Sequence, residues 1–168
     1  GVLPNMFPGY QDVTDPAVRQ KFADAWGIDV NSMDTRVGTR ITEVPHLALE
    51  GKVKAYYIMG EDPLQTEADL GLVRSGFDAL DFVVVQDIFM TKTAEVADVL
   101  LPATSWGEHG GVFTCADRGF QRFGKAIEPV GNVKRDWEII SLLAAEMGYP
   151  MQYDSERQIW DEMRELCP

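Results

Sequence analysis

The sequence predicts an α/β fold, with a mostly parallel sheet flanked by helices, on three observations. Two short runs rich in β-branched and aromatic residues, 53–59 and 82–86, are typical of strands. Between them, residues 67–78 place apolar side chains at helical spacing. A third apolar run, 99–101, follows after a short connection. This alternation of elements implies parallel strands joined by right-handed crossovers.

The residues before the first strand predict an arm and two helices. Residues 1–14 contain prolines and a glycine without apolar periodicity, which predicts an irregular arm. Asp15 is suited to cap a helix over 16–26, which Gly27 would end. Thr42 is expected to cap a short helix that leads into the first strand.

The residues after the third strand predict a loop region and two further helices. Residues 103–132 are rich in glycine and polar groups, so we expect ordered loops with short extended pieces. Asp136 is expected to cap the first of the two helices. Ser155 and Gln158 have the spacing of a capping box at the start of the last helix.

The length of the chain indicates one domain. Its 168 residues, of which 45% are hydrophobic, suffice to bury a core. We therefore expect a single α/β segment over 1–168, made of an irregular arm (1–14), an α/β core (15–150) and a C-terminal helix (151–168). The opening residues have neither an initiator methionine nor a signal-peptide pattern, so we interpret the chain as part of a larger subunit.

Charge and cysteine content exclude several classes of protein. The net charge of −12 disfavours nucleic acid and anionic membrane surfaces as partners. The longest apolar runs fall far short of the roughly 20 residues that a membrane helix needs, so we expect no membrane insertion. Cys115 and Cys167 are too few for a disulfide framework or a thiolate metal site, and a reducing, cytoplasmic location fits.

Polar residues follow two predicted strands at the points where these end. Gly60, Glu61 and Asp62 follow the first strand, and Gln86 and Asp87 close the second. Ligands of open parallel sheets bind beyond the carboxyl ends of the strands. A carboxylate there can accept two N–H bonds from a planar donor edge such as that of guanine. The alternative is that these acids cap the segments that follow, because Asp is common at such turns.

Other candidate sites are weaker. The sheet pattern is Rossmann-like without a GxGxxG motif, and a phosphate loop is also missing, which disfavours ordinary NAD and ATP sites. His109 in its glycine-rich loop and Cys115 among apolar neighbours are most simply structural, so no catalytic residue and no metal ligand is assigned. Arg118, Arg122 and Lys125 could contact an anionic ligand or pair with nearby carboxylates, and both interpretations stay open.

Ordered segments along the chain resemble the molybdopterin oxidoreductase family. The segments that carry this resemblance are Gly60–Pro63, Val85–Ala94 and Ala97–Pro102. Three later segments are similar to the formate dehydrogenase branch of that family, of the formate-hydrogenlyase type: Ser105–Thr114, Asp117–Arg122 and Asp136–Ile140. The resemblance covers nearly the whole chain, from Gly1 to Trp160.

The resemblance implies a bis(molybdopterin guanine dinucleotide) cofactor with Mo or W, in a large catalytic subunit that oxidises formate to carbon dioxide. Two nucleotide-binding α/β domains of such enzymes each hold one guanine dinucleotide arm, and this segment looks like much of one of them. The implied cofactor contacts are Gly60, Glu61, Asp62, Thr66, Gln86 and Asp87. Asp62 or Asp87 is expected on the guanine edge.

The resemblance also implies groups that this segment does not carry. The metal ligand, its neighbouring histidine and arginine, and a [4Fe-4S] cluster are expected in the full subunit only, so the isolated segment is expected to be inactive. The implied partners are the remaining domains of the same subunit, electron-transfer subunits, and formate as substrate. Two alternatives stay open. One is a segment of a related molybdopterin oxidoreductase or electron-transfer subunit, and the other is a cofactor-free α/β interaction module.

Overall fold

The computed structural model describes residues 3–117 and 119–167. The chain groups into two compact units, one formed by residues up to 43 together with those from 154 onward, and the other by 44–153. The expectation of a single α/β segment over 1–168 stays a prediction. None of the helices in the described residues is long and apolar enough to cross a membrane.

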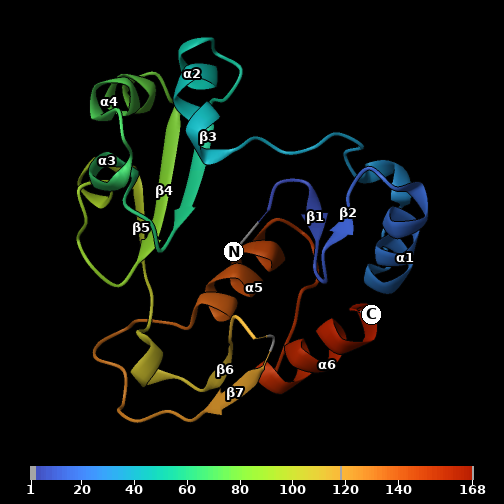
Figure 1. The fold of residues 1–168 in the computed structure, drawn as a ribbon. Helices are drawn as coiled ribbons and strands as arrows, with labels where there is room; N and C mark the ends of the chain where they lie inside the picture. The colour runs from blue at the N-terminus through green and yellow to red at the C-terminus, as the bar shows by residue number, and fades with distance from the viewer. Residues whose placement is uncertain (1–2, 118, 168) are drawn as a thin grey trace. The chain divides into compact units, whose positions relative to one another are not determined.

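The larger unit is built on a three-stranded parallel sheet. Its strands are β3 (Ala55–Met59), β4 (Phe82–Asp87) and β5 (Val99–Pro102), in the order β3-β4-β5 (Figure 1). The register pairs Met59 with Gln86, and Gln86 with Leu101. The predicted α/β class with parallel strands is confirmed, and the carboxyl ends of all three strands lie at the same edge of the sheet.

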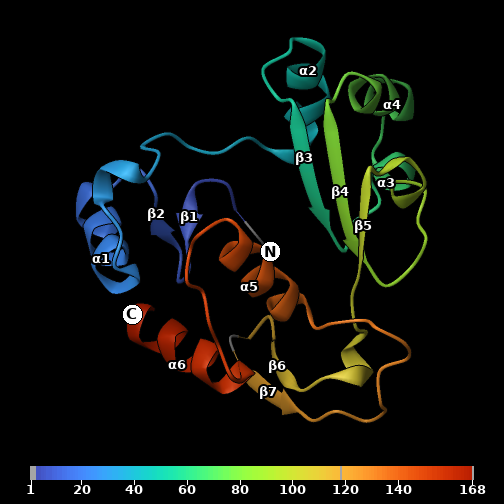
Figure 2. The same ribbon diagram turned by 180° about the vertical axis from the view of Figure 1, so that it is seen from behind.

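Helices flank this sheet in both ribbon views (Figures 1 and 2). They are α2 (Val44–Leu49), α3 (Pro63–Thr66) and α4 (Leu70–Asp78), whereas α5 (Asp136–Glu146) lies beyond the carboxyl ends of the strands. The main core joins strand residues with α3, α4 and the short helix η3 (Ala94–Val96). It consists of Ile58, Leu64, Val73, Phe77, Val83, Val85 and Ala94.

The helix predicted over 67–78 is present as α4 but begins three residues later, at Leu70, and α3 is a separate turn that ends before the predicted range. Between α3 and α4, Asp69 leaves the helical conformation and its side chain accepts a hydrogen bond from Leu72 N at 3.0 Å. An Asp that satisfies a free amide in this way begins a new helix, so the helical spacing alone placed the boundary wrongly.

The remainder of the larger unit is mostly loop, as expected for 103–132, but it contains an antiparallel hairpin. Its strands are β6 (Gly111–Thr114) and β7 (Phe120–Phe123). The short helix η4 (Trp106–Glu108) precedes the hairpin. A parallel bridge between Ala103 and Lys134 then brings the chain to the start of α5, beside the end of β5.

The smaller unit contains α1 (Pro16–Trp26) and α6 (Glu156–Leu166), with the short helices η1 (Val30–Ser32) and η2 (Ile41–Glu43). The helix predicted over 16–26 is confirmed with its caps. Asp15 accepts a bond from Ala17 N at 2.8 Å, and Gly27 ends the helix with φ 64°. The arm expected to be irregular instead contains a hairpin, β1 (Met6–Phe7) and β2 (Gln11–Asp12).

The hairpin forms because Gly9 (φ 76°) and Tyr10 (φ 59°) both take positive φ, which reverses the chain between the strands. The predicted cap at Thr42 is wrong, and Ser155 precedes α6 as predicted but without the bonds of a capping box. Thr42 lies inside the short helix η2, which begins at Ile41, so it cannot cap the helix that follows. The Glu43 side chain instead accepts a hydrogen bond from Arg40 N at 2.9 Å. Gln158 accepts the amide of Asp154, and not that of Ser155, at 2.8 Å.

Candidate functional site

A pocket of about 530 Å³ opens at the carboxyl edge of the parallel sheet, within the larger unit. It lies where the loops after β3 and β4 approach the start of α5. Its lining residues are Met59, Gly60, Glu61, Asp62, Thr66, Gln86, Asp87, Ile88, Phe89, Thr91, Ala103 and Asp136. The structure therefore brings all six predicted site residues to one pocket, at the position where open parallel sheets bind ligands.

Gly60 leaves open space at the end of β3. It has φ 65°, its amide donates to Gln86 O at 3.0 Å, and a Cβ atom built on it would meet no atom within 4 Å. The positive φ disfavours other residues here. Because nothing fills the space beside it, a ligand can approach the backbone at this point.

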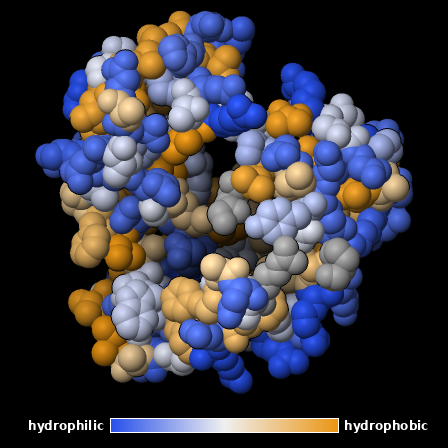
Figure 3. All heavy atoms as spheres, viewed as in Figure 1, coloured by the Kyte–Doolittle hydropathy of each residue, from blue (hydrophilic) through white to orange (hydrophobic). Residues whose placement is uncertain are grey.

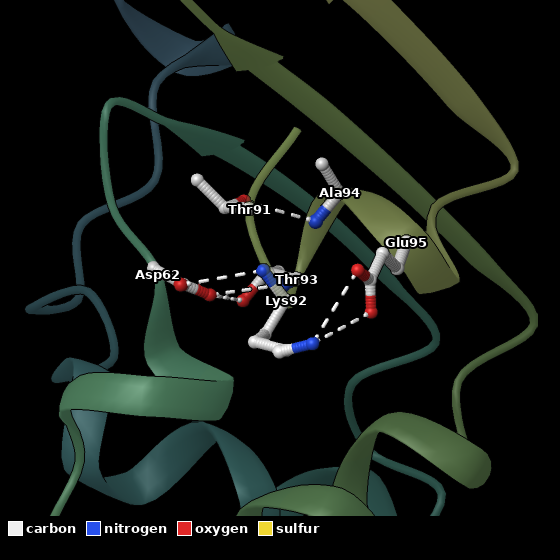
Figure 4. A network of polar contacts seen from close by, with 6 residues as sticks. All are labelled: Asp62, Thr91, Lys92, Thr93, Ala94 and Glu95. Carbon is white, nitrogen blue, oxygen red and sulfur yellow. Dashed lines mark hydrogen bonds and ion pairs between the residues drawn. The ribbon is translucent and has the colours of Figure 1, made fainter. Parts of the chain in front are cut away.

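Asp62 bonds to residues about thirty positions away in the sequence (Figure 4). Its Oδ1 accepts bonds from Thr93 N at 2.9 Å and from Thr93 Oγ1 at 2.6 Å, and its Oδ2 accepts one from Lys92 N at 3.3 Å. The Thr93 side chain is fully buried, and its hydroxyl oxygen accepts a bond from Leu64 N at 3.2 Å. Asp62 thus ties the loop after β3 to the start of η3, and its side chain makes no capping bond to α3, the segment that follows it.

The Asp87 carboxylate accepts fewer hydrogen bonds than that of Asp62. Its Oδ1 accepts one bond, from Phe89 N at 3.0 Å, in the turn that follows β4. Its other carboxylate oxygen makes no hydrogen bond within the part of the chain that the structure describes. Thr66 donates its hydroxyl to Asp62 O at 3.0 Å, inside its own turn. Asp87 therefore keeps a carboxylate oxygen available for a ligand in the pocket.

Gln86 is completely buried, and both ends of its amide are engaged. Its Oε1 accepts a hydrogen bond from the Tyr57 hydroxyl, and its Nε2 donates to Asp136 Oδ1 at 2.6 Å. The predicted cap at Asp136 is wrong, because Arg135 is the capping residue and Asp136 is the first residue of α5. Its carboxylate instead faces Gln86 and lines the pocket.

The pKa of Tyr57 is raised above its ordinary value of 10.0, first by burial and then by the negative charge of Asp136. Because the unfolded chain ionises first, the tyrosine's contribution to stability is complete below pH 10 and is lost as the pH rises toward the folded pKa. Both causes favour the neutral hydroxyl, which is the form that donates to Gln86.

We predict that Tyr57→Phe lowers the free energy of unfolding at pH 7 by about 1–3 kcal/mol, because it leaves the buried Gln86 oxygen without a donor. The difference from the wild type should shrink above pH 10, where the wild-type tyrosine loses its advantage. Urea unfolding at both pH values measures this. Tyr10→Phe, at an exposed tyrosine, is the control and should change neither value. Equal effects of the two substitutions would contradict the role given to Tyr57.

The remaining candidates have local contacts. His109 Nδ1 lies 2.8 Å from Gly110 O, and its ring meets Phe123 edge-on, in keeping with a structural role. Cys115 is a free, half-buried thiol. Lys125 pairs with Glu128 at 2.6 Å, while Arg118 lies outside the described residues. Within 3–117 and 119–167, no group of three or more His, Cys, Asp or Glu side chains could hold a metal ion.

Several other residues of the pocket are not marked by any local sequence pattern as site residues. The sequence predicts Asp136 only as a helix cap, because its contact with Gln86 spans fifty residues and leaves no local signal. Ile88 and Phe89 follow the predicted strand end directly. Two apolar residues at a turn are a sequence signal for a ligand site, because they are exposed to water unless a ligand or another part of the protein covers them.

Comparison with known proteins identifies the family. Residues 11–146 match the family described as Molybdopterin oxidoreductase. Over its whole length the chain is 62% identical to formate dehydrogenase H of Escherichia coli, of which it spans 23%. It is 40% identical to F420-dependent formate dehydrogenase 1 subunit alpha of Methanococcus maripaludis, of which it spans 24%. The chain thus corresponds to about a quarter of these relatives.

A solved structure also shares this fold. Acetylene hydratase from Pelobacter acetylenicus superposes with a TM-score of 0.62 and 25% identity, over 82% of this chain and 20% of the other. Residues 11–146, which the family matches, include β3, β4 and β5 and every residue of the pocket. On these findings, the chain belongs to the molybdopterin oxidoreductase family.

Proposed function

We propose that this chain holds one guanine dinucleotide arm of a bis(molybdopterin guanine dinucleotide) cofactor, as part of the large subunit of a molybdenum or tungsten formate dehydrogenase. One observation carries the proposal. Gly60, Glu61, Asp62, Thr66, Gln86 and Asp87 all line a single pocket at the carboxyl edge of a parallel sheet. The similarity to formate dehydrogenases over the whole chain supports the choice of enzyme.

The residues of the pocket fit a purine nucleotide. Open space beside Gly60 lets a ligand approach the backbone, and Asp87 has a carboxylate oxygen available. A carboxylate that accepts the ring N–H and exocyclic amine of guanine makes two charge-assisted bonds. We assign the guanine edge to Asp87, because Asp62 already accepts three bonds from Lys92 and Thr93. Asp62 and Gln86 then hold the walls of the pocket in place.

The bound cofactor would supply the redox chemistry, at a metal whose ligands lie outside this chain. The contribution of this segment is to bind and orient one arm. Formate as substrate, a [4Fe-4S] cluster elsewhere in the subunit and electron-transfer subunits as partners belong to the same proposal. A cytoplasmic location is also part of it, since Cys115 and Cys167 are both free thiols.

The exposed apolar surface supports a larger assembly. Apolar side chains reach the surface in several places on the face shown in Figure 3. Large exposed apolar side chains of the larger unit include Trp106, Phe120, Val130 and Met147. Where such side chains lie together, they mark surfaces that other parts of a protein cover. The remaining domains of the subunit are the proposed cover.

A second candidate is a molybdopterin enzyme with another substrate. The solved structure with the same fold is named acetylene hydratase, and a fold does not determine a reaction. This candidate shares the cofactor-binding role of the segment and differs only in the chemistry of the complete enzyme. Assay of the purified holoenzyme with formate and an artificial electron acceptor separates the two, since only the first candidate reduces the acceptor.

The cofactor-binding role is tested in the complete subunit with Asp87→Asn. We expect the wild type to carry Mo or W and a guanine-containing pterin. The pterin content of the variant should be lower by about tenfold or more, because each hydrogen bond to a charged group contributes about 1.5–3 kcal/mol. Metal analysis and mass spectrometry of the released nucleotide measure both. Asp78→Asn, an exposed residue outside the pocket, is the charge-matched control. Full pterin content in Asp87→Asn would refute the assignment.

A further inference from the structure

We infer that Phe89 is the stacking surface for the purine base in this pocket, an inference that rests on the proposed function. Phe89 lines the pocket two residues after Asp87, and 71% of its surface is exposed. Its neighbour Met90 is similarly exposed, at 65%, but does not line the pocket. Exposure alone therefore does not single out Phe89, whereas its position in the pocket does.

The backbone on both sides of Phe89 is held in place. Its amide donates to Asp87 Oδ1 at 3.0 Å, and its carbonyl oxygen accepts a bond from Thr91 N at 3.0 Å. The turn after β4 therefore has a defined conformation before any ligand binds. The same turn carries the Asp87 carboxylate and the Phe89 ring, so the positions of the two groups are coupled.

A purine base has two features that such a pair can recognise. Its edge presents N–H donors in the plane of the ring, which a carboxylate accepts. Its face is an apolar π surface, which stacks on an aromatic side chain. Asp87 offers the first kind of partner and Phe89 the second. Ile88, which lies between them in sequence, also lines the pocket and adds apolar surface to it.

The test uses the complete subunit, purified free of cofactor, with guanosine diphosphate as the probe in isothermal titration calorimetry. We expect Phe89→Leu, which keeps an apolar side chain without an aromatic face, to bind the probe roughly 5- to 50-fold more weakly, in line with base–aromatic stacking. Phe89→Tyr should restore wild-type affinity. Met90→Leu, next to it in sequence, is the matched control and should bind as the wild type does.

The outcomes separate this inference from the proposed function. If Phe89→Leu binds the probe as the wild type does while Asp87→Asn loses it, the stacking role is wrong and the proposed site stands. If Phe89→Leu lowers only the melting temperature of the nucleotide-free subunit, another part of that subunit covers the ring, which also overturns the inference. If the wild type binds neither the probe nor the guanine-containing pterin, the proposed function fails and the inference with it.

Discussion

Replacing Asp62 with alanine is expected to lower the free energy of unfolding of this chain by about 2–5 kcal/mol. The carboxylate is the acceptor for both the amide and the hydroxyl of Thr93, which is fully buried (Figure 4). Each buried donor left without an acceptor costs about 1–3 kcal/mol. Lys92 N loses its acceptor as well, although that bond is longer, at 3.3 Å, and more exposed.

The matched control is Asp87→Ala, in the same pocket and with the same change in charge. Asp87 accepts one bond from an exposed turn, so its loss should lower stability by less than about 1 kcal/mol. Urea unfolding of the two variants gives the comparison. In the complete subunit both substitutions should reduce the cofactor content. Equal destabilisation by the two would show that Asp62 does not hold the two loops together.

The second large effect is expected from Gly76→Ala in α4. A Cβ atom at this position would lie 2.6 Å from Pro45 Cα and 2.8 Å from Pro45 Cβ, in α2. Both residues are buried, so neither helix can yield without disturbing its packing. Overpacking of a core costs about 1–3 kcal/mol, and contact with backbone atoms places this substitution at the upper end, near 3 kcal/mol.

Gly71→Ala in the same helix provides the control. The nearest atom to its added Cβ is the Asp69 carboxylate oxygen, at 3.5 Å, which is ordinary contact. Alanine there should be neutral or should raise stability by up to about 1 kcal/mol, because glycine is costly in a helix. Urea unfolding again measures both. A neutral result for Gly76→Ala would mean that α2 and α4 are not in the close contact described.

The local chemistry of the chain explains most of the elements that were predicted. Helix α1 begins after Asp15, at Pro16, and ends at Gly27. Each of these residues acts on backbone groups in the adjacent turn of the helix. Strands β4 and β5 lie in apolar runs that end at Asp87 and Pro102. Such signals involve neighbours in sequence, so they can be recognised without the folded structure.

The errors at caps have a common physical cause. Asp136 and Thr42 are both residues that favour helix starts, yet neither caps its helix. Several polar residues close to each start could satisfy the same free amides. The choice among them depends on what else each side chain can reach, and for Asp136 this is the buried amide of Gln86.

The sequence by itself determined the α/β class, the strand ends that form the pocket and, through family resemblance, the molybdopterin oxidoreductase family. Only the tertiary structure decided how the carboxylates divide their roles. Asp62 and Asp87 look alike in sequence, as acids that follow strands, but Asp62 meets the donors of Thr93 thirty-one residues away. Hydrogen bonds between segments far apart in the sequence depend on the tertiary fold. Short-range sequence patterns do not show which distant segments come into contact.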